Sequence, residues 1–431
     1  MDSIWRKTAE RPKFPALDQD IKAEVLIIGG GMAGLLCAHR LAQAGVNYVL
    51  VEAEEIGGGV TGNTTAKVTA QHGLIYDKLI QTFGLETARK YLEANQKAVE
   101  AYRALSREIP CDFEEQEAIV YTLHDRGPLE RELTALKRLG VPAQLREGLP
   151  LPFPTAGGVC FPGQGQFHPL KFLAGLTKGL RIYEHTKVWE LRPGQAVTNG
   201  GKIQAEQIIV ATHFPFLNKH GSYFLKLYQH RSYVLALENA PVFQGMYVDG
   251  SREGLSFRRY GDCLLLGGGS HRTGKQGGGW KSLTGFVRRY FPEAREVRRW
   301  ATQDCMTLDG IPYIGPYSGR TKGLYVATGF NKWGMTSSMV AAEILTDLVQ
   351  GKENPNASVF SPMRSMFRKQ LAINTMEAAK GLLTPTVPRC PHMGCALHYN
   401  DQEHSWDCSC HGSRFTKGGR LLNNPANDDK K

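Results

Sequence analysis

A glycine-rich turn between two apolar strands constrains the fold of this chain more than any other feature. Residues 24–52 contain the apolar run EVLII, the turn GGGMAG, an amphipathic stretch that ends at Gly45, and a second apolar run, NYVLVE. Apolar runs on either side of a helical period predict a near-complete βαβ unit. In the pattern G-x-G-x-x-G, Gly29 allows the tight turn, Gly31 lets backbone amides approach a pyrophosphate, and Gly34 lets the helix pack closely on the strand.

An acidic residue at the end of the second strand strengthens this interpretation. Glu52 lies about 20 residues beyond the turn, where a carboxylate binds ribose hydroxyls and would repel a 2′-phosphate. A glycine-rich turn by itself is common and could be purely structural. The strand, the helix and the acid together predict a dinucleotide site.

Composition and charge limit the class of protein. The chain has 431 residues, enough for two or three domains, and its 52 basic and 41 acidic residues give a net charge of +11. It has no dense Lys/Arg run and no aromatic-interleaved basic stripe, so a well-solvated surface explains the charge and we expect no nucleic-acid partner. The longest apolar run, Val25 to Ala38, is too short and too rich in glycine to span a bilayer, and residues 1–20 lack a signal-peptide core. We expect a cytoplasmic protein without a membrane span.

The rest of the chain alternates between helical and extended patterns, which favours an α/β fold. Helices are expected at residues 85–109, 129–140, 168–180 and 336–348, with a polar, methionine-rich helix at 363–380. Strands are expected at residues 181–191, 207–213, 231–239, 261–269 and 323–329.

Four of the nine cysteines lie close together near the carboxyl end. Cys390 and His392 form a C-x-H pair, and Cys408 and His411 form a C-x-x-H pair. Two thiolates and two imidazoles can hold a [2Fe–2S] cluster of Rieske type, in which the cysteines bind one iron and the histidines bind the other. Zinc also takes two cysteines and two histidines, so the ligand set alone leaves both metals open.

Three separated segments resemble one family of flavoproteins. The segments are EAEEIGGGVTGNTTAKVTAQHGLIY, DGIPYIGPY and GLYVATGFNKWGMTSS, and their order resembles that in the glycine oxidase/D-amino-acid oxidase superfamily of FAD-dependent oxidoreductases. The resemblance implies an α/β fold in which a discontinuous Rossmann-like FAD-binding domain is interleaved with an α+β substrate domain. The implied FAD-binding domain comprises residues 20–80, 156–215 and 300–352, and the implied substrate domain comprises residues 81–155 and 216–299.

The same resemblance implies the contacts to FAD. Glu52 would hold the adenosine ribose, the backbone near Val188 would contact the adenine, and the amino end of the last helix would face the flavin pyrimidine edge. Free amides at a helix end stabilise the negative charge of a reduced flavin, which gives this last contact a physical basis. The expected FAD-binding residues are Gly29, Gly31, Gly34, Glu52, Thr64, Thr65, Lys67, Val188, Gly334, Met335, Thr336 and Ser337.

No catalytic residue is assigned, but several side chains are candidates. Lys67 lies in the loop that resembles the one beside the isoalloxazine and could stabilise the reduced ring, with an ordinary surface lysine as the alternative. Arg258 and Arg259 could bind a substrate carboxylate bidentately, although solvated strand charges are commoner. The remaining candidates, for which core packing is at least as good an explanation, are His72, Trp333, Tyr233 and His168.

The flavin is expected to be bound without a covalent bond. In the sarcosine-oxidase branch of the resembled family a cysteine binds the flavin, and the register against Thr307 to Asp309 puts Thr302 at that place. Cys305 does not align with this position.

The carboxyl end resembles a Rieske [2Fe–2S] module. Cys395 and Cys410 match the Rieske variant in which a disulfide ties the two cluster loops together. Gly412-Ser413 matches the loop that donates hydrogen bonds to cluster sulfur. The resemblance favours iron–sulfur over zinc and implies a helical linker at residues 353–385 followed by a minimal module at 386–431.

Two departures from the Rieske pattern bear on this module. Phe415 stands where the family often has a tyrosine that donates to a cysteine ligand. The tail after His411 is short, although it keeps Pro425 where the family has its proline-containing loop. We therefore expect a small subdomain that leans on the flavoprotein part.

The whole chain resembles a set of bacterial FAD-dependent oxidoreductases that carry a Rieske module. This resemblance implies oxidation of a C–N bond of an amine or amino acid, with hydride transfer to the flavin and one-electron exchange with the cluster. A small-molecule substrate and a one-electron carrier protein are the candidate partners. The alternatives are a reductase fed inward through the cluster and a redox-sensing or electron-transfer protein without a small substrate. A buried cavity with a convergent Arg or Tyr favours an enzyme, whereas a flavin face capped by side chains favours a sensor.

Overall fold

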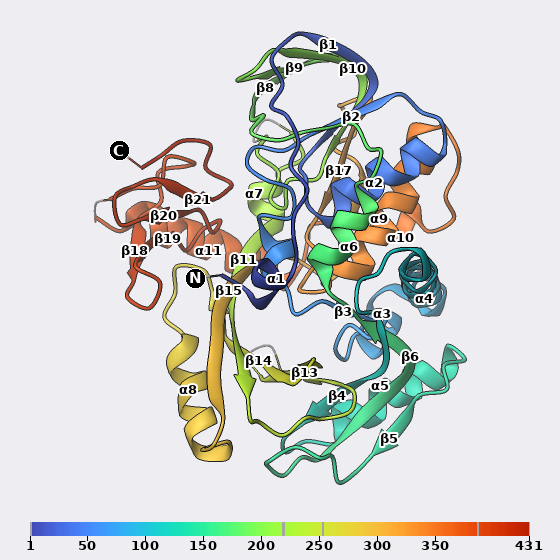
Figure 1. The fold of residues 1–431 in the computed structure, drawn as a ribbon, viewed down its shortest axis with the longest axis vertical. Coiled ribbons are helices and arrows are strands. Elements are labelled where there is room, and N and C mark those ends of the chain that lie inside the picture. Colours follow the sequence, from blue (N-terminus) through green and yellow to red (C-terminus); the bar gives the residue numbers. More distant parts are fainter. Residues whose placement is uncertain (1, 218–219, 252–253, 386–387, 431) are drawn as a thin grey trace.

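The βαβ unit predicted at residues 24–52 lies within a mainly parallel sheet (Figure 1). Its parts are β1 (Ile21–Ile28), α2 (Met32–Gln43) and β2 (Tyr48–Val51) in the computed structural model, which describes residues 2–217, 220–251, 254–385 and 388–430. Strand β1 pairs in parallel with β2 and with β10 (Lys202–Val210). The carboxyl half of β1 and all of β2 are buried, as expected for strands that are covered on both faces.

This first sheet has eight strands in the order β16-β17-β10-β1-β2-β7, with β8 and β9 attached beside β10. The strands not yet given are β7 (Ile182–Tyr183), β8 (Val188–Arg192), β9 (Gln195–Thr198), β16 (Tyr313–Pro316) and β17 (Leu324–Thr328). Residues 181–191 were expected as one strand but form β7 and β8. His185 has a positive φ of 49°, and the amides of His185 and Thr186 bond to the carbonyls of Glu54 and Glu52, which ends β7.

Helices cover this sheet on the side away from β8 and β9. Helix α2 packs on α9 (Gly334–Val349), and α9 packs on the long α4 (Leu85–Glu108). The predicted apolar face of α4 is buried, including Tyr91 and Tyr102. The other helices are α1 (Ile4–Thr8), η1 (Val60–Asn63), α3 (Tyr76–Phe83), α5 (Gly127–Arg138), α6 (Pro169–Leu176), α7 (Tyr223–Lys226) and α10 (Ala357–Phe360). No helix among the described residues is long and apolar enough to cross a membrane.

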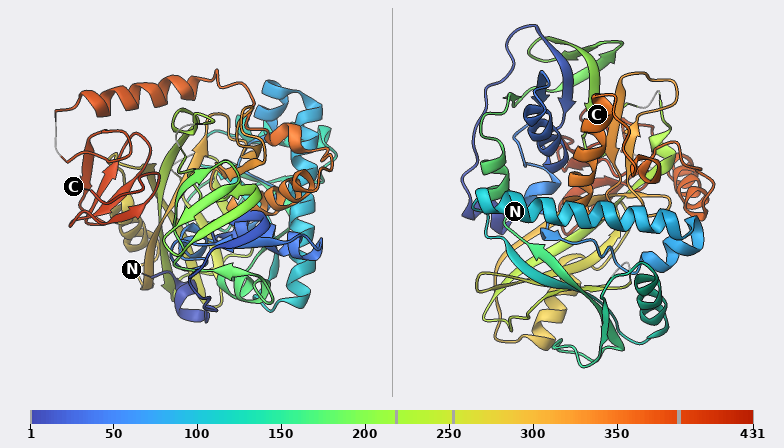
Figure 2. Two further views of the ribbon diagram at one scale, coloured as in Figure 1. Left: turned by 90° about the horizontal axis from the view of Figure 1, so that it is seen from above. Right: turned by 90° about the vertical axis from the view of Figure 1, so that its right-hand side faces the viewer.

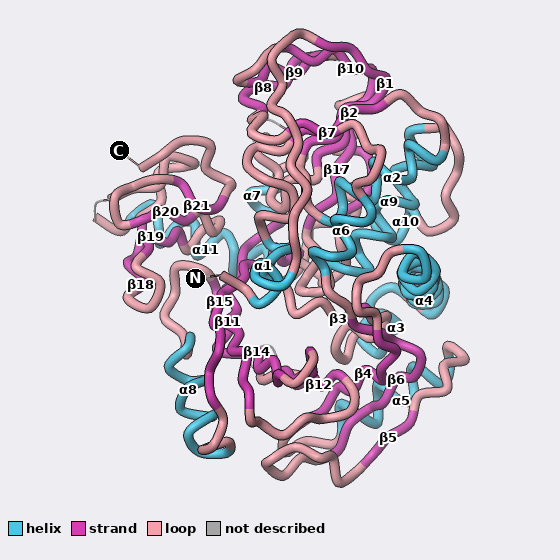
Figure 3. The backbone as a smooth tube through the Cα atoms, viewed as in Figure 1, coloured by secondary structure: helices cyan, strands magenta, loops and turns pink. Residues whose placement is uncertain are grey.

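A second, nine-stranded sheet has the order β15-β11-β14-β13-β12-β4-β6-β3, with β5 beside β6 (Figure 3). Its strands are β3 (Lys67–Val68), β4 (Glu114–Thr122), β5 (Gln144–Arg146), β6 (Gly157–Gln166), β11 (Leu227–Glu238), β12 (Met246–Asp249), β13 (Ser256–Tyr260), β14 (Cys263–Arg272) and β15 (Arg295–Thr307). Helix α8 (Gly279–Tyr290) packs on β14 and β11. Strands β3 and β6 and most of β15 lie within ranges predicted for the FAD-binding domain yet pair in this sheet, and the predicted domain boundaries remain a prediction.

The carboxyl-terminal module is a separate four-stranded antiparallel sheet of β18 (Leu397–Asn400), β19 (Ser405–Cys408), β20 (Arg414–Thr416) and β21 (Leu421–Asn423). Helix α11 (Lys369–Leu383) leads into it from the body of the protein (Figure 2). The predicted helix at 363–380 therefore begins later than expected, because Arg364 instead bonds Asp309 at 3.0 Å and the carbonyls of Ile311 and Pro312. The predicted first residue of the module, 386, lies outside the described residues.

Candidate functional site

A cavity of about 690 Å³ runs from the glycine-rich turn to the face of the second sheet. Its lining brings together most of the residues predicted to bind FAD. Those lining the cavity are Gly29, Gly31, Glu52, Thr64, Thr65, Lys67, Val188, Gly334 and Met335. Gly34, Thr336 and Ser337 lie behind this lining, in helices α2 and α9.

The glycine-rich turn has the geometry that its sequence predicted. Gly29 has φ +114°, and a Cβ there would collide with the carbonyl of Ala211 at the end of β10. A Cβ on Gly34 would overlap the carbonyl oxygen of Gly29, so the helix approaches the strand as closely as glycine allows. A Cβ on Gly31 would meet only Thr61 Oγ1, at 3.5 Å, so the backbone there is open toward the cavity.

Glu52 is held at the cavity wall by backbone amides. Its Oε2 accepts from Gly30 N at 2.6 Å and its Oε1 accepts from Glu54 N at 3.0 Å. Burial raises the pKa of this carboxyl group, and the two amide hydrogen bonds oppose the rise. Each carboxylate oxygen keeps a further lone pair for a ribose hydroxyl.

Lys67 is a half-buried amine at the cavity. Burial, helped by the nearby charge of Arg258, lowers its pKa to about 7. Its Nζ lies 3.4 Å from Thr65 Oγ1, within the same loop. An anion bound in the cavity would favour the protonated amine.

Arg258 occupies a different place from the one expected of a carboxylate ligand. It does not line the cavity, and its Nη1 donates to the carbonyls of Thr65 and Ala66, the latter at 3.0 Å. Ala66 has a positive φ of 54°, so Arg258 fixes an unusual turn in the loop that carries Lys67. Arg259 forms a half-exposed ion pair with Glu114 at 3.3 Å.

His72 is a neutral residue that positions Trp333. Its ring nitrogens lie 2.6 Å from Tyr91 Oη and 2.8 Å from the carbonyl of Thr69, and burial lowers its pKa to about 3. Its ring stacks on Trp333 with centroids 5.0 Å apart, and both residues line the cavity. His168 lies outside the lining, where its Nδ1 accepts from Lys171 N at the start of α6.

A polar cluster that the sequence reasoning missed faces the cavity from β11 and β15. His230 and Asp304 are paired directly across these two strands, and both line the cavity with Lys332. Burial raises the pKa of Asp304 to about 6, against the opposing charges of Lys332 and Arg231. Lys332 Nζ also bonds Ser270 Oγ at 3.2 Å. Because no arginine among the described residues lines the cavity, this cluster is the convergent polar group of the site.

Two buried polar atoms test whether the cavity suits a cofactor. Thr302 Oγ1 and His213 Nε2 are buried without a hydrogen-bond partner in the described chain, and both residues line the cavity. Together with the glycine-rich turn, these atoms fit a large polar ligand such as FAD. Cys305 lies outside the lining and contacts Thr328, and no cysteine of the described chain lines the cavity; the non-covalent flavin stays a prediction.

The four predicted cluster ligands lie on two similar loops of the module. Cys390 N donates to Cys395 O and Gly394 N to Cys390 O, each at 2.9 Å, and the loop from Cys408 to Ser413 is closed by the same two kinds of bond. A hydrogen bond from the Cys390 thiol to the Cys408 sulfur raises the pKa of Cys390 and lowers that of Cys408. Cys408 therefore loses its proton more easily. Thiolates are the cysteine form that binds metal.

The two histidine ligands face each other. His392 Nδ1 and His411 Nδ1 lie 3.3 Å apart, and burial lowers the pKa of both imidazoles, which favours the neutral form that binds metal. The donor set of two sulfurs and two Nδ1 atoms fits a Rieske cluster. The sulfurs of Cys395 and Cys410 both lie within 4.8 Å of that of Cys408, with all three as free thiols, so the disulfide stays a prediction.

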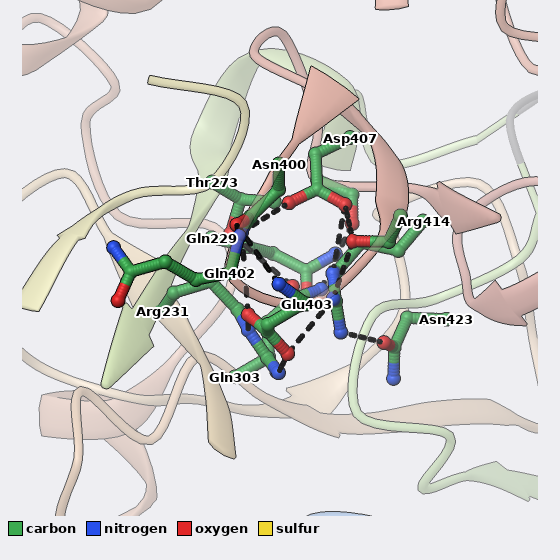
Figure 4. A network of polar contacts seen from close by, with 12 residues as sticks. Gln229, Arg231, Thr273, Gln303, Asn400, Gln402, Glu403, Asp407, Arg414 and Asn423 are labelled. Atoms are coloured by element: carbon green, nitrogen blue, oxygen red, sulfur yellow. Dashed lines mark hydrogen bonds and ion pairs between the residues drawn. The ribbon is translucent and has the colours of Figure 1, made fainter. Parts of the chain in front are cut away.

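Strands β11 and β15 form a ribbon between the cavity and the second cluster loop, and residues 421–424, 426 and 427 of the module also line the cavity. Alternate side chains of this ribbon, among them Tyr228, His230, Thr302 and Asp304, line the cavity. The intervening ones contact the module (Figure 4). Gln229 Nε2 donates to the carbonyl of His411 at 2.9 Å, and Gln303 Nε2 donates to that of Gly412 at 2.8 Å.

A buried charge network completes this docking. Glu403 of the module bonds Arg231 Nε at 2.9 Å and Arg414 Nη2 at 2.9 Å, and all three side chains are under 10% exposed. Tyr233, a catalytic candidate, lines the cavity, and its hydroxyl donates to Glu403 of the module at 3.0 Å. Burial would raise the pKa of Glu403, but the two arginines lower it to about 2.

The fold and both sites define a flavoprotein that carries an iron–sulfur module, and comparison with known proteins agrees. The model of the family described as FAD dependent oxidoreductase matches residues 24–348, and that of the Rieske [2Fe-2S] domain matches residues 356–430. The chain therefore belongs to the FAD-dependent oxidoreductases and contains a Rieske [2Fe-2S] domain. The predicted fold class and both predicted cofactors, FAD and the [2Fe–2S] cluster, are confirmed.

Individual relatives and solved structures match most of this chain. The chain is 36% identical, over 99% of its length and 96% of the relative, to YhfW of Bacillus subtilis (strain 168), whose name describes a Rieske 2Fe-2S iron-sulfur protein. It is 24% identical to the gamma-glutamylputrescine oxidoreductase of Escherichia coli (strain K12), covering 78% of this chain and 86% of the relative. Glycine oxidase from Geobacillus kaustophilus has the same fold, with a TM-score of 0.68 and 23% identity over 80% of this chain and 99% of that structure.

Proposed function

We propose that this chain oxidises the C–N bond of a small amine or amino acid and passes the electrons singly to its Rieske cluster. FAD supplies a two-electron hydride acceptor and the cluster a one-electron acceptor. The observation that carries the proposal is the β11/β15 ribbon, because it lines the flavin cavity with one face and bonds the cluster loop with the other. The ribbon thus joins the cavity wall to the loop that carries Cys408 and His411.

The polar cluster in the cavity supports an amine end on the substrate. Asp304 and His230 lie side by side on the ribbon, where an ionised Asp304 would bind a substrate ammonium group. Lys332, near Asp304, offers a cation for a second, anionic group of the substrate. The buried cavity and this convergent cluster favour an enzyme over a sensor whose flavin face is capped.

Electrons could leave the cluster for a one-electron carrier protein, which remains the candidate partner. The cluster gives the flavin an outlet other than oxygen, since a hydride delivers two electrons and this cluster carries one. The compartment in which this exchange takes place remains an expectation from the sequence.

The test is anaerobic mixing of the loaded protein with a panel of amines, amino acids and hydroxy acids. Amines or amino acids should bleach the flavin absorbance, and an EPR signal of the reduced cluster should follow. A panel in which no C–N compound bleaches the flavin would contradict the proposed reaction.

A variant separates the two halves of the proposal. His392→Ala should abolish the Rieske EPR signal, leave bleaching largely intact, and stop turnover with an external one-electron acceptor. If that turnover survives loss of the cluster, the flavin discharges directly and the electron route is wrong.

A further inference from the structure

One cation of the flavoprotein part reaches the cluster-binding loop. Arg272, the last residue of β14, donates from Nε to Ser409 O at 2.9 Å and from Nη2 to Cys410 O at 3.1 Å. Ser409 and Cys410 are the two residues between the cluster ligands Cys408 and His411. The planar guanidinium therefore holds the second cluster loop by two parallel bonds.

The same guanidinium also contacts the wall of the flavin cavity. Its central carbon lies 4.9 Å from the centre of the Tyr228 ring, and Tyr228 lines the cavity from β11. Tyr228 is 4% exposed, so this cation–π contact is shielded from water. An aromatic ring, a half-buried guanidinium and two peptide carbonyls thus form a continuous contact from the flavin cavity to the cluster loop.

The charge of Arg272 acts on the metal centre. Reduction adds a negative charge to the cluster, and a nearby cation stabilises the more negative form. Arg272 bonds the carbonyls of Ser409 and Cys410, the residues between the ligands Cys408 and His411, so its charge lies beside the ligand loop. The acid that faces Arg272 is Glu377 of α11, which is itself paired with Lys275.

We propose that Arg272 raises the reduction potential of the cluster and, with Tyr228, forms the path by which electrons cross from the flavin. The role of the path rests on the proposed function, whereas the effect on the potential does not. Because Arg272 belongs to the flavoprotein part, the cluster acquires its working potential only when the module is docked. Arg272 is a positioning residue, since it contacts the ligand loop and not the ligand atoms, and its charge acts on the cluster from there.

The test is a redox titration of the full-length, cluster-loaded protein, followed by EPR. Arg272→Gln should lower the midpoint potential of the cluster. Arg272→Lys keeps the charge but not the pair of hydrogen bonds to the two carbonyls, and it should restore most of the potential. The control is Arg289→Gln, which removes an exposed arginine stacked on Tyr290 of α8 and should leave the potential unchanged. An unchanged potential in Arg272→Gln, with the EPR line shape intact, would overturn the proposal.

Two more variants keep the test decisive. Glu377→Gln removes the negative charge that faces Arg272 and should raise the potential, so an unchanged value overturns the proposal even if Arg272→Gln fails to bind its cluster. Tyr228→Leu should leave the potential unchanged and slow cluster reduction after the flavin is bleached; an unchanged rate removes Tyr228 from the path. If Arg272→Gln shifts the cluster potential but no substrate bleaches the flavin, the role of Arg272 stands and the proposed function fails.

Discussion

The flavoprotein part and the Rieske module are held together by different forces. The flavoprotein core is built from fully buried aliphatic and aromatic side chains such as Val25, Leu35 and Trp300. Among the described residues, the apolar cluster of the module consists of Cys390, Cys395, Leu397, Cys408, Cys410, Phe415 and Ala426. Most of these are cysteines, so the module buries little hydrocarbon and relies on its metal centre and on docking. One part supports itself, and the other depends on a cofactor and a neighbour.

Of the substitutions considered, removing a cluster ligand should change the stability of the module the most. Cys408→Ser should eliminate the Rieske EPR signal, because a hydroxyl does not replace the thiolate ligand, and should expose residues 388–430 to proteolysis while residues 2–352 stay protected. Limited proteolysis with mass spectrometry measures both parts at once. Cys263→Ser, away from the cluster, is the control. A module that stays protected without its cluster would show that it is self-supporting.

Breaking the buried ion pairs of Glu403 should have the second largest effect. Glu403→Gln leaves Arg231 and Arg414 without their shared carboxylate and should destabilise the docked module by about 3 kcal/mol. The pKa of Glu403 is lowered to about 2, so its contribution in the wild type is present above pH ~4.3 and is lost as the pH falls toward 2. Urea titration followed by cluster absorbance measures the change.

The matched control for this loss is an exposed pair. Glu190→Gln removes the partner of Arg192, which lies 2.9 Å away at the surface, and should change stability by less than about 0.5 kcal/mol. Equal effects of the two substitutions would mean that docking does not depend on the buried charges.

Asp304→Asn should stabilise the flavoprotein part, whereas Glu403→Gln should destabilise the docked module. Because burial raises the pKa of Asp304 to about 6, the ionised side chain costs stability above that pH, and the asparagine should stabilise the protein at pH 8 by up to about 3 kcal/mol. Wild-type stability should rise as the pH falls from 6 toward 4, and this dependence should weaken in the variant. The variant should also bind amines less tightly. Thermal unfolding at pH 5 and pH 8 checks the first effect, and a destabilised variant at pH 8 would contradict it.

Phe415→Tyr should produce the smallest change. Phe415 is fully buried in the apolar cluster of the module, and a tyrosine hydroxyl there could donate to cluster sulfur. We expect the cluster potential to rise, because hydrogen bonds to sulfur stabilise the reduced form. A redox titration without a rise would show that the hydroxyl finds another partner.

The sequence predicted what depends on local patterns. Gly29, Gly34 and Glu52 are identified by spacing along one βαβ unit, and the cluster ligands by spacing within two short loops. These features need no knowledge of distant contacts. The family, the fold class and both cofactors could therefore be predicted, whereas individual site roles remain predictions.

The sequence could not predict contacts made across strands. His230 and Asp304 lie far apart in the chain and meet only through the register of β11 and β15. Successive side chains of a strand point to opposite faces, so a one-residue error in the register moves a side chain from the cavity to the core. Arg258 and Tyr233 are catalytic candidates by their place in the predicted substrate domain, but Arg258 fixes a loop, and the Tyr233 hydroxyl bonds the module at the edge of the cavity. The run of four polar residues from Gln229 to Ser232, in an otherwise mostly apolar strand, was the available signal.

The burial of the cluster ligands has a consequence for maturation. Cys390, Cys408 and His411 are 2%, 0% and 3% exposed, and Arg272 and Gln229 cover the second loop from the flavoprotein side. An iron–sulfur delivery protein needs both loops open to place its cargo. We therefore expect loading to precede docking, so that the flavoprotein part covers the second loop only after the cluster is in place.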